Sequence, residues 1–168
     1  MTNDAASGGM ATRVLTTSYG ELDDAMLSIL THARQHIKIL SMAWDYPLLE
    51  RKSFADALEN YLRASRLHLC QIVLMDATSA ERNAERLKRL VRLFSDQLQV
   101  HTPGRQLANI QDNFILVDGA HLVRQLHYAQ PRTVAIGNDK KAVKPYELAF
   151  ETLWESSHVA IHATVLGL

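Results

Sequence analysis

The stretch Gln111-Asp112-Asn113-Phe114-Ile115-Leu116-Val117-Asp118 is the most informative part of the chain. Its apolar centre, Phe114 to Val117, is short and bounded by polar residues, which is typical of a buried strand. Side chains alternate between the two faces of a strand, so Gln111 and Asn113 are predicted to point the same way. Two amide side chains therefore precede the apolar centre of this strand, and Asp118 follows it.

Longer apolar runs upstream of this stretch indicate the fold class. Residues 37–44 and 69–75 are nearly continuous in apolar residues, and each run follows a segment with helical spacing, at residues 22–30 and 54–62. Continuous runs favour strands that are covered by helices on both sides. We therefore predict an α/β domain with a mixed β-sheet flanked by helices on both faces.

Shorter segments complete the predicted order of elements. We expect a helix at about residues 79–94, short strands at residues 98–101, 121–128 and 133–136, and a last helix at residues 143–154. The strand at Phe114 and the strand that follows it are predicted to form an antiparallel hairpin, because a Gly-Ala turn separates them.

Composition and length set the broad class of the protein. The 168 residues are 47% hydrophobic, which is enough for one core without disulfides or metals. Basic and acidic residues number 18 each, so no global charge attracts nucleic acid or anionic membranes. The single Cys70 lies in an apolar run, and we expect it in the core. No segment approaches the roughly 20 apolar residues of a membrane span. We expect a soluble cytoplasmic protein with a flexible arm at residues 1–18 and one domain at residues 19–168.

The order of these elements resembles one half of the phospholipase D-like superfamily, from about Tyr19 to Ser157. Members of that superfamily have His-x-Lys, four further residues and Asp at the strand that corresponds to the opening stretch. In this sequence Gln111 stands at the His position, Asn113 at the Lys position and Asp118 at the Asp position. The chain is most similar to small bacterial members in which this pattern is eroded.

The resemblance implies that the superfamily's reaction is lost. In active members, two halves from one chain or from a homodimer share one site, where a His attacks phosphorus and Lys residues hold the phosphoryl oxygens. A nucleophile of this kind needs a basic nitrogen, which Gln111 lacks, and Asn113 has no charge to stabilise a developing oxyanion. We expect an inactive half-domain that serves as a binding or assembly module. Its expected partners are a second copy of the chain and a phosphate-containing or other small polar ligand.

A vestigial pocket is predicted from the resemblance and from strand parity, with five members: Gln111, Asn113, Asp118, Arg124 and Asn138. Arg124 shares parity with apolar residues of its strand and is a candidate anion-binding group, the alternative being an ion pair with an acid. Asn138 is the nearest match to a Gly-Ser-x-Asn turn of active members. Trp44, Asp45 and Asp76 follow predicted strands, where open α/β sheets place ligands, and they are candidates for the rim. The alternative for these three residues is packing and turn capping.

Two other functions stay open on the sequence alone. The first is a phosphodiesterase or nuclease with a displaced active site, in which His121 or His127 of the next strand is the nucleophile. The second is a sequence-independent nucleic-acid binder that uses the arginine-rich segment from Arg82 to Arg92. Glutamates interrupt that segment, so a solvated helix face with local ion pairs explains the same residues.

No cofactor and no metal site are predicted. Two histidine pairs have a spacing of four residues, His32 with His36 and His158 with His162. Neither pair belongs to a His-Glu-x-x-His arrangement, and no third ligand is apparent for either.

Overall fold

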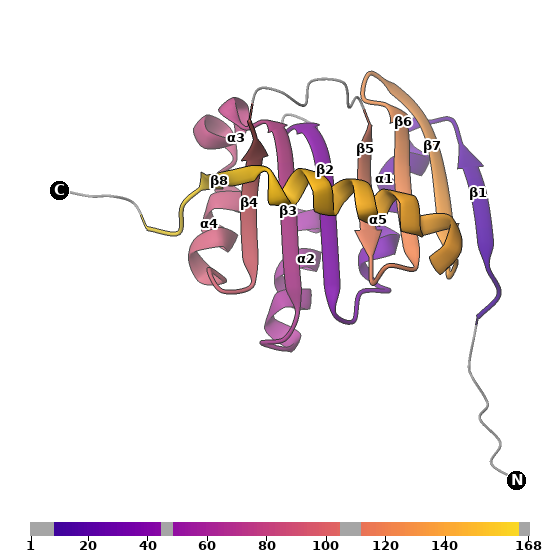
Figure 1. Ribbon diagram of the computed structural model, residues 1–168, viewed down its shortest axis with the longest axis horizontal. Helices are drawn as coiled ribbons and strands as arrows, with labels where there is room; N and C mark the ends of the chain where they lie inside the picture. Colours follow the sequence, from indigo (N-terminus) through magenta and orange to yellow (C-terminus); the bar gives the residue numbers. More distant parts are fainter. Residues whose placement is uncertain (1–8, 45–48, 105–111, 165–168) are drawn as a thin grey trace, which may run out of the picture.

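One mixed β-sheet forms the centre of the protein (Figure 1). The computed structural model describes residues 9–44, 49–104 and 112–164. The sheet has eight strands in these ranges, in the order β1-β7-β6-β5-β2-β3-β4-β8. Their bounds are β1 Thr12–Thr16, β2 His36–Ala43, β3 Leu69–Asp76, β4 Leu98–Pro103, β5 Asn113–Val117, β6 His121–His127, β7 Gln130–Gly137 and β8 Ser157–Ile161. Strands β2, β3 and β4 are parallel to one another, and all other neighbours are antiparallel.

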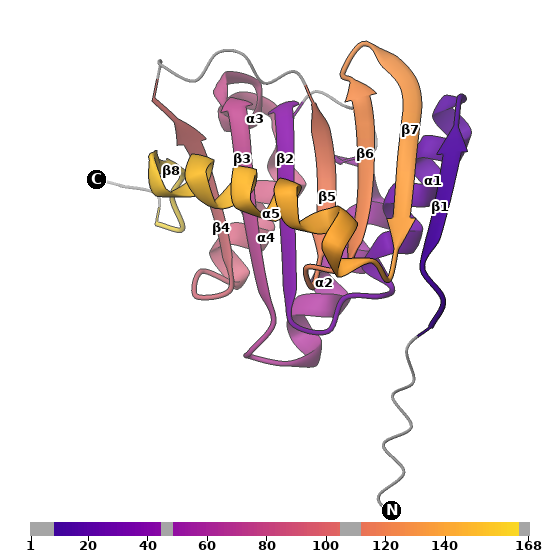
Figure 2. The ribbon, with the colours of Figure 1, turned by 45° about the vertical axis from the view of Figure 1, so that its right-hand side comes forward.

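Helices cover both faces of this sheet, as Figure 2 shows. The helices are α1 Tyr19–Leu30, α2 Lys52–Ala64, α3 Thr78–Asn83, α4 Glu85–Leu93 and α5 Lys140–Glu155. The first four lie on one face, and α5 crosses the other face alone. The predicted α/β sheet with helices on both faces is therefore confirmed. None of the described helices is both long enough and apolar enough to cross a membrane.

Helix ends are held by side chains near them in sequence. Ser18 and Glu21 form a capping box that satisfies the first backbone N–H groups of α1. Asp139 accepts a hydrogen bond from the backbone N–H of Ala142 and so caps α5. Helix α5 begins earlier than predicted, so Pro145 lies inside it rather than in its first turn.

The contact between α5 and the sheet includes a buried lysine. Lys38 of β2 is 9% exposed and forms ion pairs with Glu147 and Glu151 of α5. Its Nζ atom also lies 5.9 Å from the centre of the Phe150 ring. The lysine thus joins the centre of the sheet to this helix through two carboxylates.

Three sequence-based expectations require correction. The predicted arm at residues 1–18 contains β1, which pairs with β7 along its whole length. The strand was missed because its residues are almost all exposed, so no apolar run marks it. Strand β8 was also missed, because it is short and becomes a strand through pairing with β4.

The third correction concerns the predicted helix at residues 79–94, which is two helices separated at Ala84. Ala84 has φ −86° and ψ 65°, which interrupts the helical backbone. The carboxylate of Glu50 accepts the backbone N–H of Arg86 at 2.7 Å and caps the second helix from a distant part of the chain. This tertiary contact explains why local spacing did not predict the break.

Candidate functional site

The start of β5 holds Asn113 in a closed hydrogen-bond network. The residue is 7% exposed, its Oδ1 atom accepts the backbone N–H of Met42 at 2.8 Å, and its Nδ2 atom donates to Oε1 of Gln125 at 2.9 Å. The Nε2 atom of Gln125 in turn donates to the carbonyls of Tyr128 and Gln130. These bonds connect β2, β5 and the β6–β7 hairpin, so the amide of Asn113 contributes to the sheet. Gln111 lies outside the described residues.

Arg124 lies on the other face of the sheet from Asn113. It pairs in register with Phe114, whose side chain belongs to the core under α5, whereas Asn113 has the opposite parity. The guanidinium donates to the carboxylate of Asp112 at 2.7 and 3.0 Å and to the hydroxyl of Tyr146 at 3.0 Å. The alternative foreseen for this arginine, an ion pair with an acid, is the one observed.

Asp118 follows the far end of β5 and binds backbone groups. Its carboxylate accepts three backbone N–H groups at 2.7 to 2.9 Å, those of Arg34, Gln35 and His36. Asp118 itself has φ 50°, a left-handed conformation that aspartate tolerates better than most residues. The carboxylate therefore fastens the loop before β2 to the β5–β6 turn.

Asn138 also lies at this far end, directly after β7. Its backbone N–H donates to Nδ1 of His121 at 3.2 Å, and its side-chain amide donates to the carbonyl of Gly9. Because His121 pairs with the last residue of β5, Asn138 and Asp118 are a strand length away from Asn113. The described members of the predicted pocket are thus divided between two ends and two faces of the sheet.

The described rim candidates have structural partners. Trp44 is buried and donates from its indole nitrogen to Glu50 at 2.8 Å. Asp76 accepts the backbone N–H of Thr78 at 2.9 Å, and this bond lowers the pKa of its carboxyl group. Both contacts agree with the packing and capping alternative. Asp45 lies outside the described residues.

Two histidines meet at a position that the sequence did not suggest. The rings of His32, just after α1, and His121, at the start of β6, stack with centres 4.7 Å apart and an angle of 15° between their planes. Burial lowers the pKa of His121, the neighbouring His32 lowers it further, and Asp118 opposes the shift. Nothing in the sequence links these two residues, because the contact depends on how α1 lies across the sheet.

The displaced-site hypothesis needs His121 or His127 to lie beside Arg124 and its acid, and neither histidine does. His121 is the first residue of β6, three positions before Arg124, and its parity places its side chain on the other face of the sheet. His127 stacks on Tyr128 at the hairpin tip, and its Nδ1 atom accepts the backbone N–H of Ala129 at 3.2 Å. Arg124 pairs instead with the carboxylate of Asp112 at 2.7 Å.

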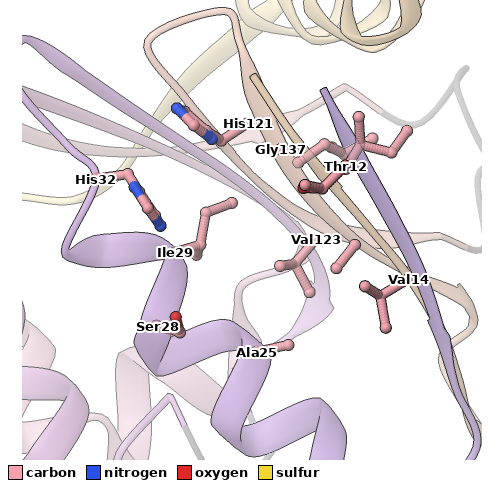
Figure 3. Close-up of a pocket in the computed structure, with 12 residues that line it drawn as sticks. Thr12, Val14, Ala25, Ser28, Ile29, His32, His121, Val123 and Gly137 are labelled. Atoms are coloured by element: carbon pink, nitrogen blue, oxygen red, sulfur yellow. The ribbon is translucent and has the colours of Figure 1, made fainter. Parts of the chain in front are cut away.

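The stacked histidines stand at the mouth of a cavity of about 190 Å³ (Figure 3). It lies between α1 and the strands β1, β6 and β7. Apolar side chains line most of it: Val14, Ala25, Ile29, Val123 and Ala135. The hydroxyls of Thr12 and Ser28 are its remaining polar side-chain groups besides the imidazoles.

Two cations of the arginine-rich segment, Lys88 and Arg89, form ion pairs. Glu59 binds Arg89 at 2.8 Å and Arg63 at 2.7 Å, and these hydrogen bonds lower the pKa of Glu59 to about 2. Lys88 pairs with Glu85 at 2.6 Å. The solvated face with local ion pairs is therefore observed here.

Metal ligands do not converge within the described ranges. No group of three or more His, Cys, Asp or Glu side chains there has an arrangement that could hold a metal ion.

The arrangement of sheet and helices is that of the phospholipase D-like fold. Nuc of Salmonella typhimurium, a phospholipase D family member, matches with a TM-score of 0.64 and 15% identity over 89% of this chain and 98% of that chain. NucT of Helicobacter pylori matches with a TM-score of 0.62 and 13% identity over 89% and 99%. The archaeal chromatin protein TrmBL2, described as showing a novel mode of DNA binding, gives 0.62 and 14% over 87% and 53%. At these identities the likeness shows the fold alone.

A family assignment follows from the sequence of the same region. Residues 18–163 match the family described as Domain of unknown function (DUF7931), and the chain belongs to this family. No curated protein matches the chain.

Proposed function

We propose that this protein is a phospholipase D-fold domain that does not hydrolyse phosphodiesters and serves as a binding or assembly module. The observation that supports this most directly is the amide of Asn113, at the Lys position of the superfamily pattern. Both its oxygen and its nitrogen are engaged within the sheet, by Met42 and Gln125. The side chain has no charge and is turned toward the protein rather than toward a phosphoryl group.

The loss of transition-state stabilisation that the eroded pattern implies supports the same proposal. Gln111 has no basic nitrogen to attack phosphorus. Loss of one oxyanion-stabilising donor typically costs about 2.7 to 4 kcal/mol of transition-state stabilisation. Replacement of both the nucleophile and the cation should therefore remove the reaction.

Hydrolysis assays test this proposal. Purified protein should release no product above buffer from bis(p-nitrophenyl) phosphate or from single- and double-stranded DNA. Activity that copurifies with the protein and disappears in Gln111→Ala would contradict the proposal. Gln71→Ala is a matched control, because Gln71 is a partly exposed sheet glutamine on the face under α5.

Binding of nucleic acid is a weaker candidate. TrmBL2 is a chromatin protein of the same fold, which favours a test with DNA. The ion pairs of Glu59 with Arg63 and Arg89 argue against it, since those guanidinium groups already have carboxylate partners. Binding to double-stranded DNA that weakens steeply with salt would favour this function. Absent or salt-insensitive binding would reject it.

A homodimer belongs to the proposal as well. Half-length members of the superfamily pair their sites across a two-fold axis. The edge strand β1, three strands away from β5, offers a separate surface for association of two copies. Val14 and Leu15 of this strand are 54% and 56% exposed. Light scattering should find a dimer at micromolar concentration, and Leu15→Lys should convert it to a monomer. Leu148→Lys, at an exposed site of α5, should leave the dimer intact. A wild-type monomer would reject this part of the proposal.

A further inference from the structure

We propose that the cavity between α1 and the strands β1, β6 and β7 binds a small aliphatic carboxylate. The carboxylate head would lie at the stacked rings of His32 and His121, and the aliphatic tail would lie on the apolar wall (Figure 3). This site is distinct from the start of β5. The inference therefore stands whether or not the protein hydrolyses phosphodiesters.

The first argument is the arrangement of polar and apolar groups. Ala25 and Ile29 from α1 and Val14 and Val123 from the sheet present aliphatic side chains to the cavity. The imidazoles lie together at one end of it, as Figure 3 shows. A cavity with an apolar wall and a polar end fits a ligand that is itself amphipathic.

The second argument is the state of the imidazole nitrogens. Nδ1 of His121 accepts the backbone N–H of Asn138 at 3.2 Å, so in the neutral ring the proton is on Nε2, which remains a donor. The ring nitrogens of His32 make no hydrogen bond to any described residue, and the same is true of the Ser28 hydroxyl. The polar end of the cavity thus offers donors without partners.

The third argument concerns charge and favours an anion over a cation. None of the described residues that line the cavity is acidic. The acid that raises the pKa of His121 is Asp118, and its carboxylate already accepts three backbone N–H groups. Two imidazolium rings stacked at 4.7 Å repel each other, and a carboxylate at their edges would offset that repulsion.

The cavity is small and open to solvent, because Thr12, Ser28 and His32 at its edge are exposed. A short ligand suits it better than a long one. Butanoate is short, and it combines a carboxylate with a three-carbon tail. It is therefore the probe of choice.

Titration of ¹⁵N-labelled protein with butanoate, n-butylammonium and butan-1-ol tests the inference. Butanoate should shift the resonances of His32, His121 and the cavity residues, and it should bind about tenfold more tightly than either control probe. Its affinity should be higher at about pH 6 than at about pH 8, because imidazole protonation adds positive charge while the carboxylate stays ionised. Equal binding of all three probes, or no shift at saturating butanoate, would overturn the inference.

Variants test separately the contacts of the carboxylate and of the aliphatic tail. His121→Phe keeps an aromatic ring and should weaken butanoate binding about tenfold, whereas His158→Phe, on the exposed part of β8, should not change it. Ala25→Leu should fill the cavity and abolish binding while both histidines remain. If His121→Phe fails to fold, Ala25→Leu and Ser28→Ala still decide the question. Undiminished binding in folded Ala25→Leu would place butanoate elsewhere and refute the site.

Discussion

Asn113 and Gln125 face each other across β5 and β6 and share a side-chain hydrogen bond of 2.9 Å between Nδ2 and Oε1. Gln125 has no exposed surface, and its own amide nitrogen donates to two carbonyls of the following hairpin. Buried amides without partners are costly, so such a pair persists only as a complete network. The pair connects an internal strand to the tip of the β6–β7 hairpin.

Asn113→Ala should lower the free energy of unfolding by about 2 to 3 kcal/mol, because it leaves the Met42 N–H and Gln125 without their partner. Asn113→Lys, which restores the superfamily residue, should also destabilise the fold, since an ammonium cannot accept the Met42 N–H. Urea unfolding measures both effects, with Gln71→Ala as the control. A stable Asn113→Lys protein would contradict this account of the network.

The three backbone bonds of Asp118 predict an order of substitutions. Asp118→Ala should cost about 2 kcal/mol, because it removes the acceptor and keeps a side chain in the left-handed conformation. Asp118→Gly should cost less, since glycine accepts φ 50° without strain. Asp118→Asn should cost least, because it retains an acceptor. Thermal unfolding gives the order, and an alanine variant more stable than the glycine variant would contradict it.

Gly137 allows β1 to approach β7 closely. A Cβ atom at this position would lie 2.4 Å from Oγ1 of Thr12, so Gly137→Ala should destabilise the protein by about 1 to 3 kcal/mol. In a Thr12→Ala background the same substitution should cost much less. A double-mutant cycle in urea measures this coupling, and equal costs in the two backgrounds would exclude the contact as the cause.

The pKa of Glu59, lowered from 4.5 to about 2 by Arg89 and Arg63, predicts a pH dependence of stability. A carboxyl group with a lowered pKa in the folded state stabilises the protein above its ordinary pKa and loses this effect as pH falls toward 2. Glu59→Gln should therefore cost about 1 kcal/mol at neutral pH and progressively less below pH 4.5. Glu85→Gln, at a more exposed ion pair, should show a smaller change. A Glu59→Gln cost that is constant with pH would contradict the assignment.

Cys70 is 1% exposed, and burial raises the pKa of its thiol. Because the thiolate is the reactive form, a disulfide reagent such as 5,5′-dithiobis(2-nitrobenzoate) should label the native protein only as fast as the protein unfolds. Labelling should follow the urea transition measured by circular dichroism. Rapid labelling of folded protein would show that the thiol is accessible.

The sequence predicts the central strands well, because strands buried on both faces consist almost entirely of apolar residues. Strands β2 and β3 are almost continuously apolar, and the period of α1 and α2 is helical. The edge strand β1 has mostly exposed side chains, and β8 is short with one buried residue. Both become strands through pairing, with β7 and β4 respectively. Local patterns do not contain that information.

The site was less predictable because it depends on contacts between distant segments. Strand parity indicated that Arg124 faces an apolar side, yet it could not identify Asp112 and Tyr146 as its partners. The stack of His32 on His121 requires the end of α1 to meet the start of β6, which no spacing along the chain encodes. The sequence therefore predicts the central strands and helices, whereas contacts between side chains of separate elements do not follow from it.

The pairing of β1 with β7 also has a consequence for biosynthesis. Thr12 pairs in register with Gly137, so β1 stays unpaired during translation until β7 has been synthesised. Strands β2, β3 and β4 follow one another and can begin to assemble with α1 and α2 during translation. Closure of the antiparallel half then requires contacts between distant parts of the chain, which slow folding. The nascent chain consequently presents an unpaired strand while the residues between β1 and β7 are made, at the stage when chaperones would act on it.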